Sequence, residues 1–246
     1  THSTKIMLKS EGADSDGFST HLYVDGNPIK MLTGQNAWGT EDIHELMLTF
    51  CKRIFQDLNI EYTIFDLWRI RCGAYDLKRI DIARHYSVGN CHEDVRRFID
   101  ALDNASGTKF RKAFVDKGSA YFNKGSKRWS VVMYDKLKEV QRRDKQGKLH
   151  VTPEQKERLL ASLNGLVRIE LRLRSQELQE HTNENQMTGD QMTASLIDQL
   201  YATYLSRCQM NSNIRLADSV ESTLCNRLRS TYILWLKGED LRSVMS

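Results

Sequence analysis

Apolar and polar residues alternate with a period of two in three stretches of the chain, and this period predicts β-strands. The stretches run from Arg79 to Tyr86, from Trp129 to Lys136 and from Leu166 to Arg174. The positions expected to face a core are Ile80, Ile82, Val131, Met133, Val167, Ile169, Leu171 and Leu173. The opposite face would carry Asp81, Ala83, His85, Ser130, Val132, Tyr134, Lys136, Arg168, Glu170, Arg172 and Arg174. The sequence therefore predicts a sheet with one apolar and one polar face.

Other strands are predicted from short apolar runs that are bounded by turn residues. They are Lys5 to Lys9, Phe18 to Val24, Ile29 to Leu32 after the Asn27-Pro28 turn, and Tyr121-Phe122. Tyr121-Phe122 would form a hairpin with the strand from Trp129, because the connection contains Gly125 and Ser126. The mixed stretch from Ile64 to Cys72 is interpreted as a strand rather than a helix.

Helices are predicted where apolar residues recur at helical spacing or where capping residues stand. Thr40 is expected to cap a helix along Ile43, Leu46, Met47, Phe50, Ile54 and Leu58, and Asn90 one along Val95, Phe98, Ile99 and Leu102, ended by Asn104 to Gly107. Further helices are predicted from Leu137 to Lys145, from Thr152-Pro153 to about Leu163, from Gln191 to Cys208 and from Ala217 to Lys237.

These elements predict an α+β fold: a mainly antiparallel sheet with helices packed on one face, followed by a helical C-terminal region. A polar stretch from His181 to Gly189 divides the two parts. We therefore predict one domain over residues 1–181 and a helical region over residues 182–246. Because the last residues form no natural stop, we expect the chain to be a piece of a longer protein.

Composition excludes several classes of protein. The 246 residues are 40% hydrophobic, and no apolar run approaches the ~20 residues that span a bilayer. No secretory signal opens the chain. Five scattered cysteines without a C-x-x-C pair argue against a disulfide framework and a zinc finger, and favour a reducing cytoplasm.

The net charge of +4 is unevenly distributed, since lysines and arginines outnumber acids from Lys109 to Arg174. Aromatic residues stand among these basic residues: Tyr121, Phe122 and Trp129. A basic segment with interleaved aromatic residues indicates a polyanionic partner, nucleic acid first. The alternative is that the basic residues form ordinary solvated faces.

Two groups on the predicted polar face carry candidate chemistry. Tyr134 and Lys136 would pair a phenol that can attack a phosphodiester with an ammonium that neutralises phosphate charge. Asp81, His85 and Glu170 would offer ligands to a divalent cation. The alternatives are a half-buried tyrosine ring beside a solvated lysine, and carboxylates that pair with neighbouring arginines.

Four segments stand in a fixed order: Leu32-Thr33-Gly34-Gln35-Asn36-Ala37-Trp38-Gly39-Thr40, Arg79-Ile80-Asp81, Tyr134-Asp135-Lys136 and Val167-Arg168-Ile169-Glu170. This ordered set resembles the replication initiators of filamentous phages, the gene II/X family. The last three segments are also similar to the Rep_trans initiators of rolling-circle plasmids. The resemblance covers roughly residues 26 to 178.

The resemblance implies a rolling-circle initiator that nicks and rejoins one strand of origin DNA through a 5′-phosphotyrosyl intermediate. Tyr134 matches the family's nucleophile and Lys136 the lysine that follows it. Asp81 and Glu170 match two acidic positions. No His-x-His pair exists in this chain, so the expected Mg²⁺ or Mn²⁺ ligands are these carboxylates, with His85 as a third.

The remaining expectations concern partners. Lys127, Arg128, Arg168 and Arg172 would grip phosphates, and Trp129 or Phe122 would stack on an unpaired base. The expected partners are double- and single-stranded origin DNA and the host helicase and polymerase, in the host cytoplasm and without a membrane; a dimer stays open. Two alternatives remain, a DNA-binding module without chemistry and a metal-dependent nuclease that uses water.

Overall fold

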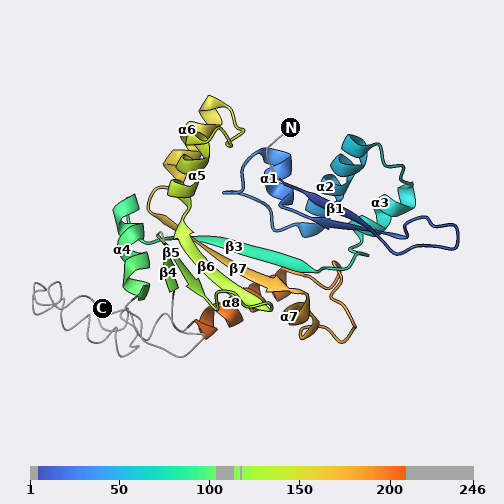
Figure 1. Ribbon diagram of the computed structural model, residues 1–246. Coiled ribbons are helices and arrows are strands. Elements are labelled where there is room, and N and C mark those ends of the chain that lie inside the picture. The colour runs from blue at the N-terminus through green and yellow to red at the C-terminus, as the bar shows by residue number, and fades with distance from the viewer. Residues whose placement is uncertain (1–4, 104–113, 117, 209–246) are drawn as a thin grey trace, which may run out of the picture.

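The computed structural model describes residues 5–103, 114–116 and 118–208, and an antiparallel sheet of five strands lies at its centre (Figure 1). The strands lie in the order β3-β7-β6-β5-β4, with the bounds β3 (Arg79–Ser87), β4 (Phe114–Asp116), β5 (Ser119–Phe122), β6 (Trp129–Asp135) and β7 (Leu166–Arg174). A separate pair consists of β1 (Met7–Glu11) and β2 (His21–Asp25).

Helices surround both sheets. They are α1 (Pro28–Thr33), α2 (Ile43–Leu58), α3 (Ile64–Arg71), α4 (His92–Asp103), α5 (Lys136–Lys145), α6 (Pro153–Ser162), α7 (Ser175–Gln179) and α8 (Ala194–Arg207). The mixture of helices with antiparallel sheets confirms the α+β class. Within the part of the chain that the structure describes, no helix is both long and apolar enough to cross a membrane.

The core lies on one face of the five-stranded sheet. The four apolar side chains of β7 predicted to face inward are all at most 4% exposed: Val167, Ile169, Leu171 and Leu173. Helix α4 adds Val95, Ile99 and Leu102 to the same cluster, and α8 adds Ile197, Leu200, Tyr201 and Tyr204. Burial of this one face explains why the alternation along the strands was so regular.

The polar face of the sheet is partly covered by a loop from the N-terminal part of the chain. This loop joins α1 to α2, and its Asn36 and Ala37 accept hydrogen bonds from β7. Gly34 makes the close approach possible: its φ is 76°, and an added Cβ would lie 2.1 Å from the carbonyl oxygen of His150. The face expected to be open to DNA is therefore open only in part.

Two predictions of strands were wrong. Ile29 to Leu32 lies in α1, because the Asn27 side chain caps the backbone amide of Lys30 and Pro28 stands in the first turn. Ile64 to Cys72 is chiefly α3, which is fixed by a reciprocal capping box between Thr63 and Asp66.

Two helix starts also differ from expectation. Helix α2 is capped by Asp42, whose side chain accepts from the amide of Glu45, and Thr40 instead accepts from the amide of Asp42. Helix α4 begins two residues after Asn90, where the Asp94 carboxylate accepts from the amides of Asn90 and Cys91.

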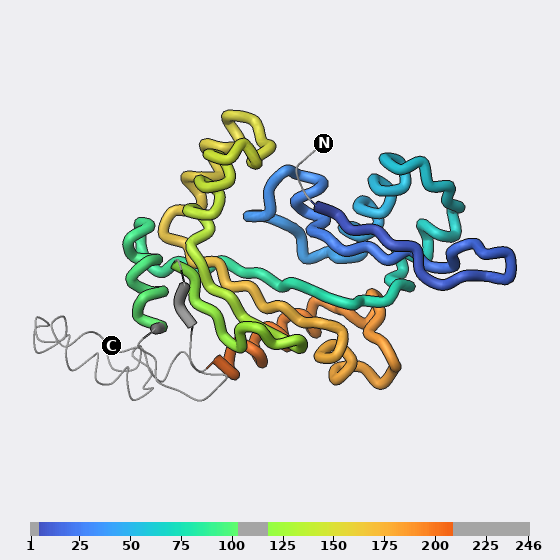
Figure 2. The backbone as a smooth tube through the Cα atoms, viewed as in Figure 1, coloured from blue at the N-terminus to red at the C-terminus, as the bar shows by residue number. Residues whose placement is uncertain are grey.

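The expected boundary after residue 181 stays a prediction. Figure 2 traces the backbone from α7 to α8 without a break, and Met187, Met192 and α8 pack on the same core as the sheet. The predicted helix from Ala217 to Lys237 and the predicted stop from Asn104 to Gly107 lie outside the described residues.

Candidate active site

Tyr134 and Glu170 meet on the polar face of the sheet from neighbouring strands. In the register of β6 and β7, Tyr134 stands opposite Arg168, and Val132 stands opposite Glu170. The hydroxyl of Tyr134 donates a hydrogen bond of 2.7 Å to Oε1 of Glu170. The shared face that strand alternation predicted therefore brings these two side chains into direct contact.

Glu170 also accepts from two arginines of its own strand. Arg168 Nε donates to Oε1 over 2.8 Å, and Arg172 Nη2 donates to Oε2 over 3.0 Å. Burial by itself would raise the pKa of Glu170, but Arg168 and the hydrogen bonds from Tyr134 and Arg172 lower it to about 2. The carboxylate is thus charged at neutral pH and fully engaged.

The phenol of Tyr134 is held in its neutral form. Burial raises its pKa, and the negative charge of Glu170 raises it further, while Arg168 acts in the opposite direction. Since the phenolate is the stronger nucleophile, the free chain holds this tyrosine in place without activating it.

Lys136 reaches the same site from a helix rather than from the strand. Strand β6 ends at Asp135, whose side chain caps α5 by accepting from the amide of Lys138. The prediction that Lys136 continues the alternation was therefore wrong. Its ammonium nevertheless lies 5.8 Å from the ring centroid of Tyr134, so the two groups meet by another route.

The ammonium of Lys136 is buried and has two partners. The residue is 1% exposed, and Nζ donates to Asn36 Oδ1 over 2.9 Å and to Glu139 Oε2 over 2.6 Å. Burial lowers the pKa of Lys136 to about 8, and Arg168 also lowers it, whereas Glu139 raises it. This lysine therefore loses its charge close to neutral pH.

Asn36 joins the two halves of the site, and sequence reasoning assigned it no role. Its side chain accepts from Lys136, while its main-chain oxygen accepts from Arg168 Nη1 over 2.8 Å. Arg168 Nη1 also donates to the carbonyl of Ala37 over 3.2 Å. The available signal was the Gly34-Gln35-Asn36-Ala37 segment itself, which was used only for the resemblance.

The three expected metal ligands do not fit a divalent cation in this arrangement. Both oxygens of Glu170 accept hydrogen bonds, and two guanidinium groups stand beside it. Asp81 lies 3.5 Å from Arg79 Nε. Within residues 5–103, 114–116 and 118–208, no three His, Cys, Asp or Glu side chains are grouped closely enough to hold one ion.

His85 lies on the same face as Asp81, as predicted, but it faces a tryptophan. Its ring centroid is 5.0 Å from that of Trp38. Burial lowers the pKa of His85 to about 4, and Arg168 and Lys136 contribute to this shift. Nε2 of His85 is buried without a hydrogen-bond partner among the described residues.

The structure corrects several of the expected DNA contacts. Trp129 and Phe122 are 5% and 1% exposed in the core, so neither ring is free to stack on a base. Arg168 is buried beneath Asn36 and Ala37. Arg172 is more accessible, with 39% of its side chain exposed, and Lys127 is exposed in the hairpin loop.

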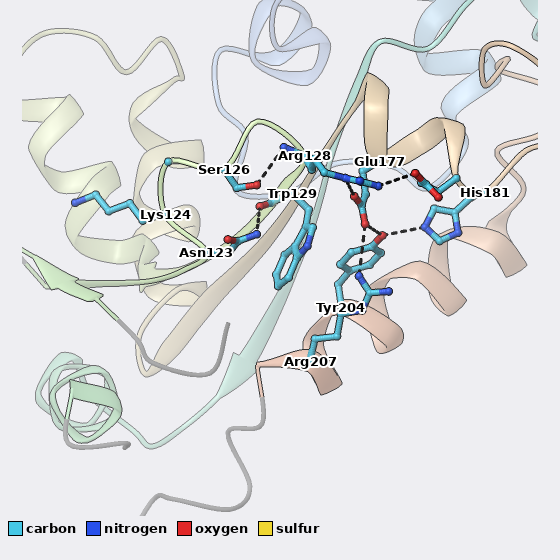
Figure 3. Close-up of a pocket in the computed structure, with 11 residues that line it drawn as sticks. Asn123, Lys124, Ser126, Arg128, Trp129, Glu177, His181, Tyr204 and Arg207 are labelled. Carbon is cyan, nitrogen blue, oxygen red and sulfur yellow. Dashed lines mark hydrogen bonds and ion pairs between the residues drawn. The ribbon is translucent and has the colours of Figure 1, made fainter. Parts of the chain in front are cut away.

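Arg128 belongs to a separate cavity of about 760 Å³ (Figure 3). Its Nε and Nη2 donate to Glu177 and Glu180 over 2.6 and 2.8 Å. Tyr204 also donates to Glu177. The cavity adjoins Trp129 at the start of β6, five residues and roughly 16 Å of strand away from Tyr134. It is therefore distinct from the candidate active site.

Comparisons with known proteins agree with this arrangement of segments. A phage replication-associated protein, from Enterobacteria phage I2-2, is 33% identical over 245 residues, which cover 99% of this chain and 69% of that relative. No solved structure matches the chain at a significant level. The family that comprises the N-terminal part of this replication-associated protein, the gene II protein, matches residues 1–223. Since this match spans most of its length, the chain belongs to that replication-associated family.

Proposed function

We propose that this chain initiates rolling-circle replication by nicking one strand at an origin, with Tyr134 as the covalent nucleophile. The observation that carries the proposal is the hydrogen bond from Tyr134 to Glu170, with the ammonium of Lys136 beside the tyrosine ring. Membership of a replication-associated phage family supports the biological role. A phenol, a carboxylate and cations are the groups that strand transfer on a phosphodiester needs.

The proposed reaction is an exchange of one phosphodiester for another. The hydroxyl oxygen of Tyr134 attacks the phosphorus, the bond from phosphorus to the 3′-oxygen breaks, and the phenolic proton passes to Glu170. The leaving 3′-oxygen takes a proton from water. The products are a 5′-phosphotyrosyl link and a free 3′-hydroxyl, which the host polymerase would extend.

Arrival of DNA would activate the tyrosine through Arg172. Glu170 is a weak base in the free chain because its pKa is about 2. Arg172 is the more exposed of its two arginine partners, and Nε of Arg172 has no hydrogen-bond partner among the described residues. A phosphate that draws Arg172 away from Glu170 would raise the pKa of that carboxylate, which would then accept the phenolic proton more readily.

Lys136 and Arg168 would have different roles. Lys136 would offset charge that develops on the phosphate, whereas buried Arg168 would hold Glu170 and the Asn36 loop in position. Rejoining would follow from the reverse reaction: a 3′-hydroxyl attacks the phosphotyrosine, and the proton returns to Tyr134. No external energy is needed because the number of phosphodiester bonds is conserved.

Dependence on Mg²⁺ or Mn²⁺ is a separate proposal, which derives from the resemblance. No step above passes through the ion, because Asp81, His85 and Glu170 do not present a ready ligand set. Origin DNA, the host helicase and the host cytoplasm likewise belong to the proposed role.

The test compares Tyr134→Phe with Tyr121→Phe on a labelled origin strand in a denaturing gel. Tyr121 is a suitable control because it lies on β5, away from Glu170, opposite Val132. We expect Tyr134→Phe to lose both the nick and the covalent adduct, with DNA affinity unchanged, and Tyr121→Phe to keep both. Cutting without an adduct would instead indicate a nuclease that uses water, and binding without cutting by the unmodified chain would indicate a module without chemistry.

A further inference from the structure

Helix α3 has an apolar outer face that nothing in the described chain covers. Ile64, Phe65 and Trp68 are 80%, 73% and 62% exposed. Their spacing of one and four residues places them on one side of the helix. The opposite side of α3 is already used, since Leu67 and Ile70 are half-buried where α3 packs on α2. The outer face is therefore surplus to the fold.

The charges around this face are arranged with opposite signs at its two ends. Glu61 and Asp66 lie at the N-terminal end, and Arg69 and Arg71 lie in the last turn. All four residues are exposed. A polyanion such as DNA would meet repulsion at the acidic end. A second α3 that runs antiparallel would instead bring each acidic end to a basic end.

We propose that the α3 face, defined by Ile64, Phe65 and Trp68, joins two copies of this chain across a two-fold axis. Centred between Phe65 and Trp68, the antiparallel arrangement sets Phe65 of each copy against Trp68 of the other. Each Glu61 then lies near the other copy's Arg71. The contact is self-complementary in both shape and charge, as a two-fold interface requires.

The available area agrees with a moderate dimer. The three apolar side chains expose on the order of 400 Å² per copy, since a large side chain presents roughly 150–250 Å². Two copies would bury about 800 Å² of apolar surface, and the flanking charged side chains bring the contact past the roughly 1,000 Å² of a specific interface. We therefore expect a dissociation constant on the order of 10 µM.

Sedimentation velocity of the full chain between about 1 and 100 µM tests the proposal. The unmodified chain should change from monomer to dimer over this range. Trp68→Ala should weaken the dimer at least about tenfold, as loss of a central aromatic residue does. Phe18→Ala is the matched control, because Phe18 is 72% exposed but lies outside α3; it should dimerise like the unmodified chain.

Charge reversal distinguishes this interface from other associations. Glu61→Arg alone and Arg71→Glu alone should each stay monomeric, because each sets like charges against each other. An equimolar mixture of the two single variants should dimerise, and so should the double variant. A chain that is monomeric at the highest concentration overturns the proposal. So do a dimer that Trp68→Ala leaves intact and a monomer whose affinity for single-stranded DNA falls with Trp68→Ala.

Discussion

Arg168 and Asn36 lie 132 positions apart in the chain, and Nη1 of Arg168 donates to the main-chain oxygen of Asn36 over 2.8 Å. The same guanidinium binds Glu170 through Nε. One side chain thus fixes both the carboxylate beside Tyr134 and the loop that holds Lys136. The integrity of the candidate site therefore depends on Arg168 more than on any exposed cation.

The first prediction is that Arg168→Met destabilises the chain by about 3 kcal/mol, because it leaves the buried Glu170 short of a cation. Arg172→Met should cost about 1 kcal/mol or less, since its side chain is 39% exposed and the ion pair is screened. Urea unfolding of the two variants measures the difference. Equal losses would show that burial of Arg168 does not decide the strength of this network.

The second prediction concerns pH. Because burial lowers the pKa of Lys136 to about 8, its charge is present below pH 8 and lost above it. The nicking rate should fall by about tenfold per pH unit above pH 8 if that charge is required. Tyr134 does not compensate, since its own pKa is raised.

Lys136→Met provides the control for this pH profile. It should nick slowly and show no break near pH 8. Stability has the opposite sign: the unfolded chain binds more protons between pH 8 and 10.5, so Lys136 makes the free energy of unfolding rise with pH over that window. A rate that keeps rising through pH 9 in the unmodified chain would exclude the charge of Lys136 from the reaction.

The third prediction concerns the metal. Asp81→Asn should raise the Mn²⁺ concentration that gives half-maximal nicking if Asp81 is a ligand, while leaving the fold intact, because its carboxylate is 39% exposed. His85→Ala should have a smaller effect. Asp76→Asn is a matched control, since Asp76 is also exposed but pairs with Lys78 instead. If Asp81→Asn and Asp76→Asn titrate alike, Asp81 is not a ligand.

The fourth prediction concerns DNA affinity. Lys127 is exposed, so Lys127→Ala should lower the slope of log affinity against log salt by about 0.9, the effect of losing one phosphate contact. Glu180→Gln should act in the opposite direction, because it removes a carboxylate that pairs with Arg128. Filter binding at several salt concentrations measures both. An unchanged slope in Lys127→Ala would remove the hairpin loop from the interface.

The elements that sequence predicted well are those with one fully buried face. Strand β7 has the predicted bounds, because its alternate residues are sealed under α4 and α8. Helix α3 was mistaken for a strand because its exposed apolar residues blur the helical period. The capping box of Thr63 and Asp66 was the stronger local signal.

The candidate site could be predicted only as far as single strands determine it. Alternation correctly set Tyr134 and Glu170 on the polar face. It could not show that Asp135 ends β6, or that a loop far away in sequence covers Arg168. Both facts depend on contacts between distant segments, which the local pattern does not encode.

The strand order has a consequence for the chain as it leaves the ribosome. Strand β7 is the last of the five strands to be made, yet it lies between β3 and β6. A nascent chain that stops before Leu166 therefore has a β3 without a neighbour and a Tyr134 without Glu170. Because synthesis proceeds from the N-terminus, the tyrosine emerges before the carboxylate that orients it, and a partly translated chain cannot assemble this site.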